Sequence, residues 1–274
     1  MRYWWIVIFM FFFSSAIART QDNSPQRIIS LAPSLTDELY LLGVEDKISG
    51  VTTYCLRPAS AQKKEKVGTV TDVNIEKIVS LKPDLVLTTS LTNPKAIERL
   101  KNLGIKTVNF PQAENFTQLC AQFLELGKLL GREREAEEIT KKAKERADVI
   151  KEEVRKLSKP KVFIQIGVRP LFTATNRSFL NDFIEFAGGI NIASRAKAGL
   201  YSYEKVLQSN PDIIVIAAMG ITGEEKKVWE KYKSLNAVKN KRIYIIDSDK
   251  FCSPTPISFT EALEEIVGIL HPEK

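Results

Sequence analysis

One sequence motif occurs twice in this chain, at residues 74–87 and again at residues 202–215. In each copy a polar capping residue and a Glu-Lys pair lead into an apolar stretch, followed by Pro-Asp and a second apolar run. Each copy predicts a short helix, a turn at the proline and a buried strand. Two such units far apart in one chain predict two similar lobes, and a pair of lobes predicts a cleft for a ligand.

A long helix is expected between the two copies, because residues 132–157 contain neither Gly nor Pro. Apolar residues recur there in steps of three and four, which is the period of an amphipathic helix: Ala136, Ile139, Ala143, Ala147, Ile150, Val154 and Leu157. Short predicted strands alternate with helices on both sides of it, which indicates parallel βαβ units. A helical connection is stiff, so we expect only small motions between the lobes.

The predicted fold is therefore α/β, with two Rossmann-like lobes joined by a single long backbone helix. The expected boundaries are a signal peptide at 1–18, a first lobe at 27–131, the connecting helix at 132–158 and a second lobe at 159–274. A single doubly wound domain with a long surface helix is the alternative, but the position of the repeat on each side of the helix favours two lobes.

The N-terminus predicts export. Arg2 precedes a short apolar run, and Ala16-Ile17-Ala18 has the small-residue pattern of a cleavage site. The apolar run is too short to cross a bilayer, which needs about 20 residues. We expect cleavage after Ala18 and a periplasmic protein, with an uncleaved membrane anchor as the alternative. No cysteine lies near the predicted site, so a lipid anchor is not expected.

Charge and cysteine content narrow the functional classes. The formal charge is +7, but basic residues are interleaved with acidic ones and form no basic–aromatic module, so nucleic-acid binding is not expected. There are three cysteines. Cys120 lies on an apolar helical stripe and is predicted to be a core residue, whereas Cys55 and Cys252 are expected in loops. Separate free thiols and a Cys55–Cys252 bridge between the lobes both remain open.

Catalytic and metal-binding patterns are scarce. The single histidine, His271, is four residues from the C-terminus, so no Ser-His-Asp triad or histidine metal cluster is expected. The chain contains no P-loop and no GxGxxG after a strand. Arg169 and Asp249 have no partner at a catalytic spacing. We therefore predict no catalytic residues, no metal site and no enzymatic activity.

Loops at the predicted strand ends are the expected ligand site, because open parallel sheets bind ligands there. Aromatic faces stack on flat ligands and arginine side chains bind carboxylates. The candidate ligand-binding residues are Tyr54, Arg57, Arg169, Phe172, Tyr201, Asp249 and Phe251. The alternative for each of them is packing into a local core.

Several segments carry a family resemblance: residues 28–37, 50–54, 74–84, 163–167 and 202–207. Together they resemble the substrate-binding proteins of ABC importers for cobalamin, haem and ferric siderophores, with the cobalamin binders nearest. The resemblance covers nearly all of the chain after the predicted signal peptide. It implies a monomeric, helical-backbone periplasmic binding protein that has no cofactor of its own. Its implied partners are an ABC permease, the ATPase of that permease and a metal-chelate small molecule.

The resemblance also implies a role for the repeated glutamates. In such proteins one glutamate on each lobe docks on arginines of the permease, and the matching positions here are Glu76 and Glu204. The alternative is that both acids only complement the dipoles of their helices, which contributes about 0.3–1 kcal/mol.

Ligand residues match the cobalamin binders in part. Tyr54, Phe172 and Asp249 fall at lining positions, and Tyr201 replaces a tryptophan near the mouth of the second lobe. Three other positions depart from the pattern: Val70 and Thr89 stand where tryptophans are expected, and Ser253 where an arginine is expected.

The expected ligand is cobalamin or a related corrinoid. Haem, ligated by Tyr54 or Tyr201, and an anionic ferric siderophore, bound by Arg57 and Arg169, are the alternatives within the same class. A branch that binds bare zinc or manganese fits poorly, because it uses histidines. An exported enzyme using the cleft, and a signalling or adhesion module without a transporter, are rivals from other classes.

Overall fold

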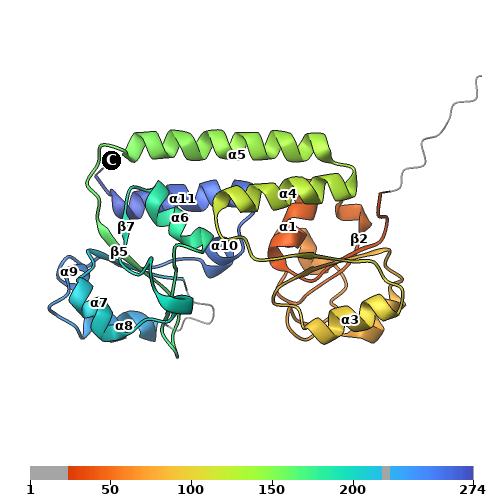
Figure 1. Cartoon of the computed structure of the whole chain (residues 1–274), viewed down its shortest axis with the longest axis horizontal. Helices are drawn as coiled ribbons and strands as arrows, with labels where there is room; N and C mark the ends of the chain where they lie inside the picture. Colours follow the sequence, from red (N-terminus) through yellow and green to blue (C-terminus); the bar gives the residue numbers. More distant parts are fainter. Residues whose placement is uncertain (1–23, 218–222, 274) are drawn as a thin grey trace, which may run out of the picture.

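The computed structural model describes residues 24–217 and 223–273. Figure 1 shows one long helix, α5 (Glu133–Val154), running along one side of the molecule, with two groups of strands and helices below it. The predicted signal peptide and its cleavage site lie outside the described residues. Within the described ranges, no helix is both long and apolar enough to span a membrane.

The first lobe is built on a four-stranded parallel sheet in the order β2-β1-β3-β4. Its strands are β1 (Ile28–Ser30), β2 (Ile48–Val51), β3 (Leu85–Thr89) and β4 (Thr107–Phe110). Its helices are α1 (Pro33–Leu41), α2 (Ile75–Ser80) and α3 (Pro94–Asn102), with two 3-10 turns, η1 (Glu45–Lys47) and η2 (Ala59–Lys63). The central strands β1 and β3 are buried along almost their whole length because helices cover both faces of the sheet.

The second lobe has a sheet in the order β6-β5-β8-β9, with β7 also paired to β5. Its strands are β5 (Lys161–Gly167), β6 (Phe172–Thr173), β7 (Ile190–Asn191), β8 (Ile213–Ile216) and β9 (Ile243–Ile245). Its helices are α6 (Phe179–Phe186), α7 (Tyr203–Ser209), α8 (Glu224–Glu230), α9 (Asn236–Lys239), α10 (Ser248–Cys252) and α11 (Pro256–Leu270), with the 3-10 turn η3 (Lys197–Gly199). All pairs are parallel except β5–β6, which is antiparallel.

The repeated motif forms the same unit in both lobes. Asn74 caps α2 by accepting a hydrogen bond from the backbone of Lys77, and Ser202 caps α7 by accepting one from Lys205. The aspartate of each Pro-Asp pair then fixes the neighbouring strand. Asp84 accepts hydrogen bonds from backbone N–H groups that lead into β1, and Asp212 accepts one from the first residue of β5 at 2.9 Å.

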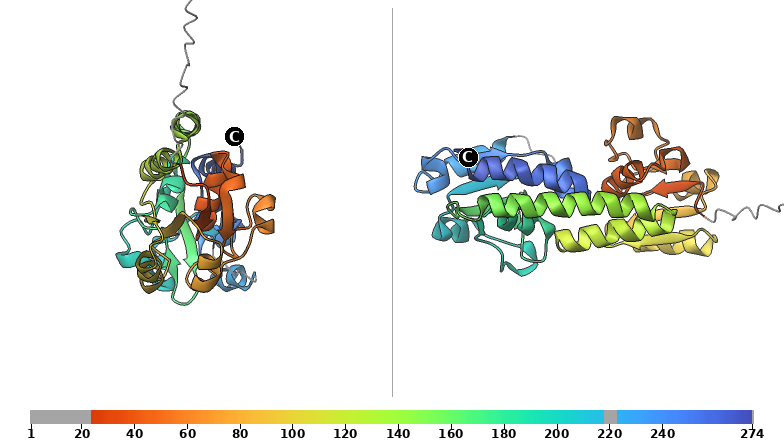
Figure 2. Two further views of the ribbon diagram at one scale, coloured as in Figure 1. Left: turned by 90° about the vertical axis from the view of Figure 1, so that its right-hand side faces the viewer. Right: turned by 90° about the horizontal axis from the view of Figure 1, so that it is seen from above.

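The long helix contributes to the cores of both lobes. Its Ala136 belongs to the first-lobe core, whereas Ala143, Ala147 and Ile150 belong to the second-lobe core. It is flanked by α4 (Phe116–Leu130) and α11, which Figure 2 shows running beside it. The predicted long helix between the lobes is thus confirmed, and α4 and α11 pack along it.

Close approach of α4 and α5 depends on Gly127. A Cβ atom at this position would overlap the Cβ atom of Ala136 and lie 3.0 Å from the carbonyl oxygen of Arg132. The contact therefore requires glycine on one helix and a small side chain on the other.

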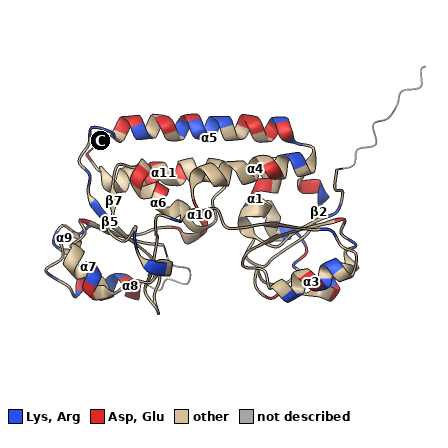
Figure 3. Cartoon of the chain, viewed as in Figure 1, with Lys and Arg blue, Asp and Glu red and all other residues tan. Residues whose placement is uncertain are grey.

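The exposed face of α5 carries both signs of charge along its length (Figure 3). Arg134 pairs with Glu138 at 3.1 Å, and Lys151 pairs with Asp148 at 2.6 Å. Exposed pairs of this kind add little stability. Their interleaving means that this face of the protein is not a basic surface for a polyanion.

Each sheet has a second core on the face away from α5. In the first lobe Ile78 of α2 packs there with Ile29 and Val86. In the second lobe Val206 of α7 packs with Phe163 and other residues of β5, β8 and α8. Neither of these two clusters contains a residue of α5. The repeat helices α2 and α7 therefore cover corresponding faces of the two lobes, and Figure 1 shows α7 on the side opposite α5.

The three cysteines are free thiols. Cys120 is fully buried, as predicted. Cys55, which was expected in a loop, is also fully buried, with its sulfur 3.1 Å from the hydroxyl of Thr36 and 3.2 Å from that of Thr52. A Cys55–Cys252 bridge is absent, so no disulfide joins the two lobes.

Candidate ligand-binding cleft

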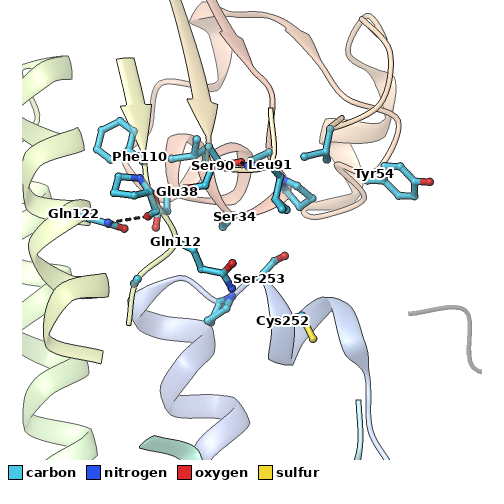
Figure 4. Close-up of a pocket in the computed structure, with 18 of the residues that line it drawn as sticks. Ser34, Glu38, Tyr54, Ser90, Leu91, Phe110, Gln112, Gln122, Cys252 and Ser253 are labelled. Atoms are coloured by element: carbon cyan, nitrogen blue, oxygen red, sulfur yellow. Dashed lines mark hydrogen bonds between the residues drawn. The ribbon is translucent and has the colours of Figure 1, made fainter. Parts of the chain in front are cut away.

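A cavity of about 750 Å³ lies between the two lobes (Figure 4). Most of its wall comes from the first lobe, at the carboxyl ends of β1, β3 and β4, where an open parallel sheet binds ligands. The second lobe contributes Phe179 and part of α10 with the residues that follow it. The lining residues are Ala32, Pro33, Ser34, Leu35, Glu38, Tyr54, Thr69, Val70, Thr71, Thr89, Ser90, Leu91, Phe110, Pro111, Gln112, Ala113, Leu119, Gln122, Phe179, Asp249, Cys252, Ser253 and Pro254.

The charge of this lining has one sign. Glu38 and Asp249 are its ionisable carboxyl groups, and no Lys or Arg belongs to the lining within the described part of the chain. The remaining polar groups are hydroxyls and the amides of Gln112 and Gln122. A strongly anionic ligand would find no basic partner among these lining side chains.

Glu38 is the most perturbed group of the cavity. It is 4% exposed and lies on the buried stripe of α1 with Leu35, Leu39 and Leu42. Burial, and then the neighbouring Asp37 carboxyl, raise the pKa of Glu38 to about 8. Figure 4 shows Glu38 on the first-lobe wall, close to Phe110 and Gln122.

A second hollow of about 470 Å³ adjoins the cavity on the second-lobe side and shares Gln112 and Ala113 with it. Phe172 lines this hollow and is 36% exposed. Its charged residues, Glu114 and Arg177, are engaged with each other at 2.5 Å. The cleft therefore extends from Tyr54 in the first lobe to Phe172 in the second.

The structure brings together three of the predicted ligand residues along this cleft. Tyr54 and Asp249 line the larger cavity, and Phe172 lines the smaller hollow. Tyr54 is 55% exposed, so its ring is free to contact a ligand. Figure 4 shows this ring at the rim of the cavity, far from Glu38.

Arg57 has a different position from the one predicted. Its Nη2 donates to the backbone oxygens of Asp249 at 3.1 Å and Ser253 at 3.0 Å, and it pairs with Asp37 at 3.6 Å. It is half-buried and lines neither hollow. The guanidinium thus connects the first lobe to α10 of the second lobe, and we describe this contact as the interlobe clamp.

Phe251 does not line the cleft, in contrast to the prediction from the sequence. It is fully buried and packs edge-on against Phe183, with ring centroids 5.1 Å apart. The expected loop at this position is the short helix α10, which directs Phe251 into the second-lobe core. The apolar ring is more stable in that core than in the wet cleft.

Arg169 and Tyr201 also lie outside both hollows. Arg169 is exposed. Burial raises the pKa of the Tyr203 phenol, and the positive charge of Arg169 acts in the opposite direction. Tyr201 packs on the second-lobe core that lies on the face of the sheet away from α5, with its ring centroid 5.7 Å from that of Phe163. Its hydroxyl donates to the carbonyl oxygen of Ile192 at 3.3 Å.

The three positions that depart from the cobalamin-binder pattern do line the cavity: Val70, Thr89 and Ser253. Sequence reasoning missed Glu38, Gln112, Gln122 and Phe179. The signal for Glu38 was present, because an acid interrupts the Leu35, Leu39, Leu42 stripe at the i+3 position. The segment around Gln112 carries no such pattern.

A family model described as periplasmic binding protein matches residues 28–250. The chain belongs to this family of periplasmic binding proteins. It is 31% identical over 262 residues to the uncharacterised ABC transporter substrate-binding lipoprotein YvrC of Bacillus subtilis, covering 93% of this chain and 82% of that protein. It is also 26% identical over 258 residues to the vitamin B12-binding protein of Vibrio parahaemolyticus, covering 92% of each.

Solved structures give the same architecture. A possible iron-binding, periplasmic solute-binding protein from Staphylococcus epidermidis superposes with a TM-score of 0.80 at 30% identity, covering 90% of this chain and 99% of that one. The predicted fold class and the resemblance are thereby confirmed.

In this periplasmic binding protein, Glu76 and Glu204 occupy matching positions in the first turns of α2 and α7. Both side chains are exposed. A hydrogen bond from its own backbone N–H, and then one from the Ser202 hydroxyl, lower the pKa of Glu204. Since α2 and α7 both cover faces remote from α5, the two acids lie on the side of the molecule opposite the long helix.

Proposed function

We propose that this protein is an exported substrate-binding protein that delivers cobalamin or a related corrinoid to an ABC importer. The observation that carries the proposal is the cleft between the lobes, whose described lining is apolar with hydroxyls, two amides and two carboxyl groups, and without a basic side chain. A corrin presents a large flat face and uncharged carboxamide side chains, which suit such a lining. The vitamin B12-binding relative supports this choice.

Haem or a ferric siderophore is the alternative within the same transporter class. Haem carries carboxylates and many siderophores are anionic, so either ligand needs basic partners. The engagement of Arg57 in the interlobe clamp and the exposed position of Arg169 outside the cavity favour the corrinoid. An exported enzyme is a third candidate, but no observation in the cleft favours it.

The importer side of the proposal assigns permease docking to Glu76 and Glu204. Their exposure on corresponding helices, on the side away from α5, supports the assignment. An Arg–carboxylate pair that loses its water on docking costs about 2–5 kcal/mol to break. The partners are then an ABC permease and the ATPase of that permease, with this protein acting as a monomer.

The proposal further includes a periplasmic location after removal of residues 1–18. It assigns residues 27–131 to the first lobe, 132–158 to the connecting helix and 159–274 to the second lobe. No cofactor of its own and no catalytic residue are part of it.

The ligand assignment is tested by equilibrium dialysis with cyanocobalamin, haemin and a ferric hydroxamate as separate probes. Absorbance spectra of protein purified from its native host are read alongside. Saturable binding of cyanocobalamin and a corrin spectrum are expected. Saturable binding of haemin or the ferric probe, with none of cyanocobalamin, overturns the corrinoid assignment.

Docking is tested separately by uptake. The double variant Glu76→Lys/Glu204→Lys should abolish importer-dependent uptake and leave ligand affinity unchanged. A matched control reverses two exposed acids at the start of α5, Glu133→Lys and Glu137→Lys, and should transport normally. Reduced affinity with normal uptake in the docking variant would refute the role.

A further inference from the structure

We infer that Glu38 is a specificity-determining contact that receives a carboxamide group of the ligand as a neutral carboxylic acid. The inference rests on the proposed function, because it assumes that a carboxamide-bearing ligand fills the cavity. It assigns a role to a residue of helix α1 that was not among the candidates in the loops at the strand ends.

The first argument is the position of Glu38. The Glu38 residue lines the cavity and yet is 4% exposed, so the little surface that it exposes faces the cleft. A leucine at this position would extend the apolar stripe of α1 at no desolvation cost. A buried carboxyl group that replaces it is destabilising unless something binds it.

The second argument is that the protein does not satisfy this carboxyl group. Throughout the residues that the structure describes, no side-chain hydrogen bond and no ion pair involves Glu38, although it is buried. The nearby Gln122 amide donates instead to the carbonyl oxygen of Pro111 at 2.8 Å. The Glu38 carboxyl oxygens are not among the fully enclosed side-chain atoms that lack a hydrogen-bond partner, so they are open to the cavity and available to a ligand group.

The third argument is the charge state. Burial first, and the Asp37 carboxyl second, raise the pKa of Glu38 to about 8, so the group is mostly protonated at neutral pH. On α4 the neighbouring titratable group is the Cys120 thiol, whose pKa burial raises to about 12. Neither Asp37 nor Cys120 supplies a positive charge that would favour the carboxylate.

More distant charges act on these neighbours. Lys144 on α5 acts on the Cys120 thiol. Arg57 and Glu261 act on Asp37 with opposite sign, Arg57 lowering and Glu261 raising its pKa. Burial therefore remains the main cause of the raised pKa of Glu38, and the surrounding charges do not reverse it.

A neutral carboxylic acid has one O–H donor and one carbonyl acceptor side by side. A primary carboxamide presents the complementary pair, a carbonyl acceptor beside an N–H donor, so the two groups form a cyclic pair of hydrogen bonds. A ligand carboxylate offers no donor and would face Asp249 as a second negative charge in the same cavity. This chemistry selects carboxamides against carboxylates.

The test uses cyanocobalamin as the probe and calorimetry as the readout. Glu38→Leu removes both hydrogen bonds, and its affinity should fall by about tenfold or more. Glu38→Gln keeps one donor and one acceptor, so its affinity should stay within about threefold of wild type. Glu45→Gln, an exposed acid in the turn after α1, is the control and should bind as wild type does.

The pH dependence gives a second readout that a purely structural role would not produce. Wild-type affinity should fall between about pH 6 and about pH 9 as Glu38 loses its proton, whereas that of Glu38→Gln should not. Cyanocobalamin derivatives with one carboxamide hydrolysed to a carboxylate add a ligand-side test. Wild type should reject one isomer more strongly than the others.

The outcomes separate the two proposals. If wild type does not bind cyanocobalamin, the corrinoid assignment fails and this inference fails with it. If wild type binds and Glu38→Leu binds equally tightly, or if all hydrolysed isomers bind alike, only the role of Glu38 is overturned. Thermal melts of each variant show whether the fold is intact, and Glu38→Gln is the variant least disturbed by the change.

Discussion

Replacing Glu38 by Gln should stabilise the protein without any ligand, and by an amount that grows with pH. The pKa of the Glu38 carboxyl is raised from its ordinary value of 4.5 to about 8 in the folded protein. Between these values the folded state keeps a proton that the unfolded state has released. Stability that Glu38 contributes therefore falls as pH rises through this window. Glutamine has the same shape and does not ionise, so the variant loses this pH dependence.

The magnitude follows from the size of the shift. A shift of about 3.5 pKa units corresponds to about 5 kcal/mol once the pH exceeds both values. Between about pH 5 and about pH 7, the linkage relation gives a loss of about 2.5 kcal/mol in the wild type relative to Glu38→Gln. A domain of ordinary stability has about 5–15 kcal/mol in total, so a difference of this size is readily measured.

The assay is urea denaturation at a series of pH values, followed by the fluorescence of the buried Trp229. The measured quantity is the free energy of unfolding of Glu38→Gln minus that of wild type. This difference should increase by about 2.5 kcal/mol between about pH 5 and about pH 7. The exposed control Glu45→Gln should give a difference that does not change with pH. A flat difference for Glu38→Gln would mean that the carboxyl is ionised in the fold, and the reasoning would be refuted.

Three further predictions concern the packing of α4 against α5, the interlobe clamp and the ligand cleft. Gly127→Ala should destabilise the fold by about 1–3 kcal/mol in urea titrations, because the new methyl group overlaps α5. The control Gly268→Ala, whose new Cβ atom would have no neighbour within 4 Å, should be neutral or stabilising by up to about 1 kcal/mol. Equal effects of the two substitutions would contradict the packing argument. Arg57→Met should speed amide exchange in α10, since it removes the interlobe clamp, and unchanged exchange counts against the clamp. Tyr54→Ala should weaken cyanocobalamin binding by about 1 kcal/mol or more in calorimetry; an unaltered dissociation constant removes Tyr54 from the site.

The structure limits how the cleft can open. Three helices, α4, α5 and α11, pack together across the two lobes, and α5 contributes side chains to the cores of both. A large hinge motion would have to disrupt these cores. The weaker connections are the interlobe clamp of Arg57 and the pair between Glu114 and Arg177, both near the cleft. We therefore expect ligand entry to involve these contacts and to leave the helical bridge intact.

The sequence predicted the architecture well because its signals are local. The predicted alternation of short strands and helices on both sides of the long helix is present, and the repeat forms the same helix–turn–strand unit in each lobe. Periodicity fails for elements of a few residues, which is why β6, β7, α9 and α10 were not predicted. The error at Phe251 follows directly, since an unrecognised helix reversed the direction of the side chain.

The site was predicted less completely, as Tyr54, Phe172 and Arg57 illustrate. The positions of Tyr54 and Phe172 along the cleft could be predicted because aromatic residues in loops at strand ends are local features of the sequence. The role of Arg57 depends on backbone oxygens of Asp249 and Ser253, which are 192 and 196 residues away along the chain. No local pattern encodes such a contact.

By itself the sequence determined an α/β chain with two related lobes, a long helix between them and one repeated acid on each lobe. These properties follow from side-chain periodicity and capping, which act over a few residues. Only the tertiary structure decided that Glu38 faces the cleft without a partner, that Arg57 connects the lobes and that Phe251 lies in the core. Burial and the identity of a partner are set by residues brought together from distant parts of the chain, so they appear only once both lobes have folded.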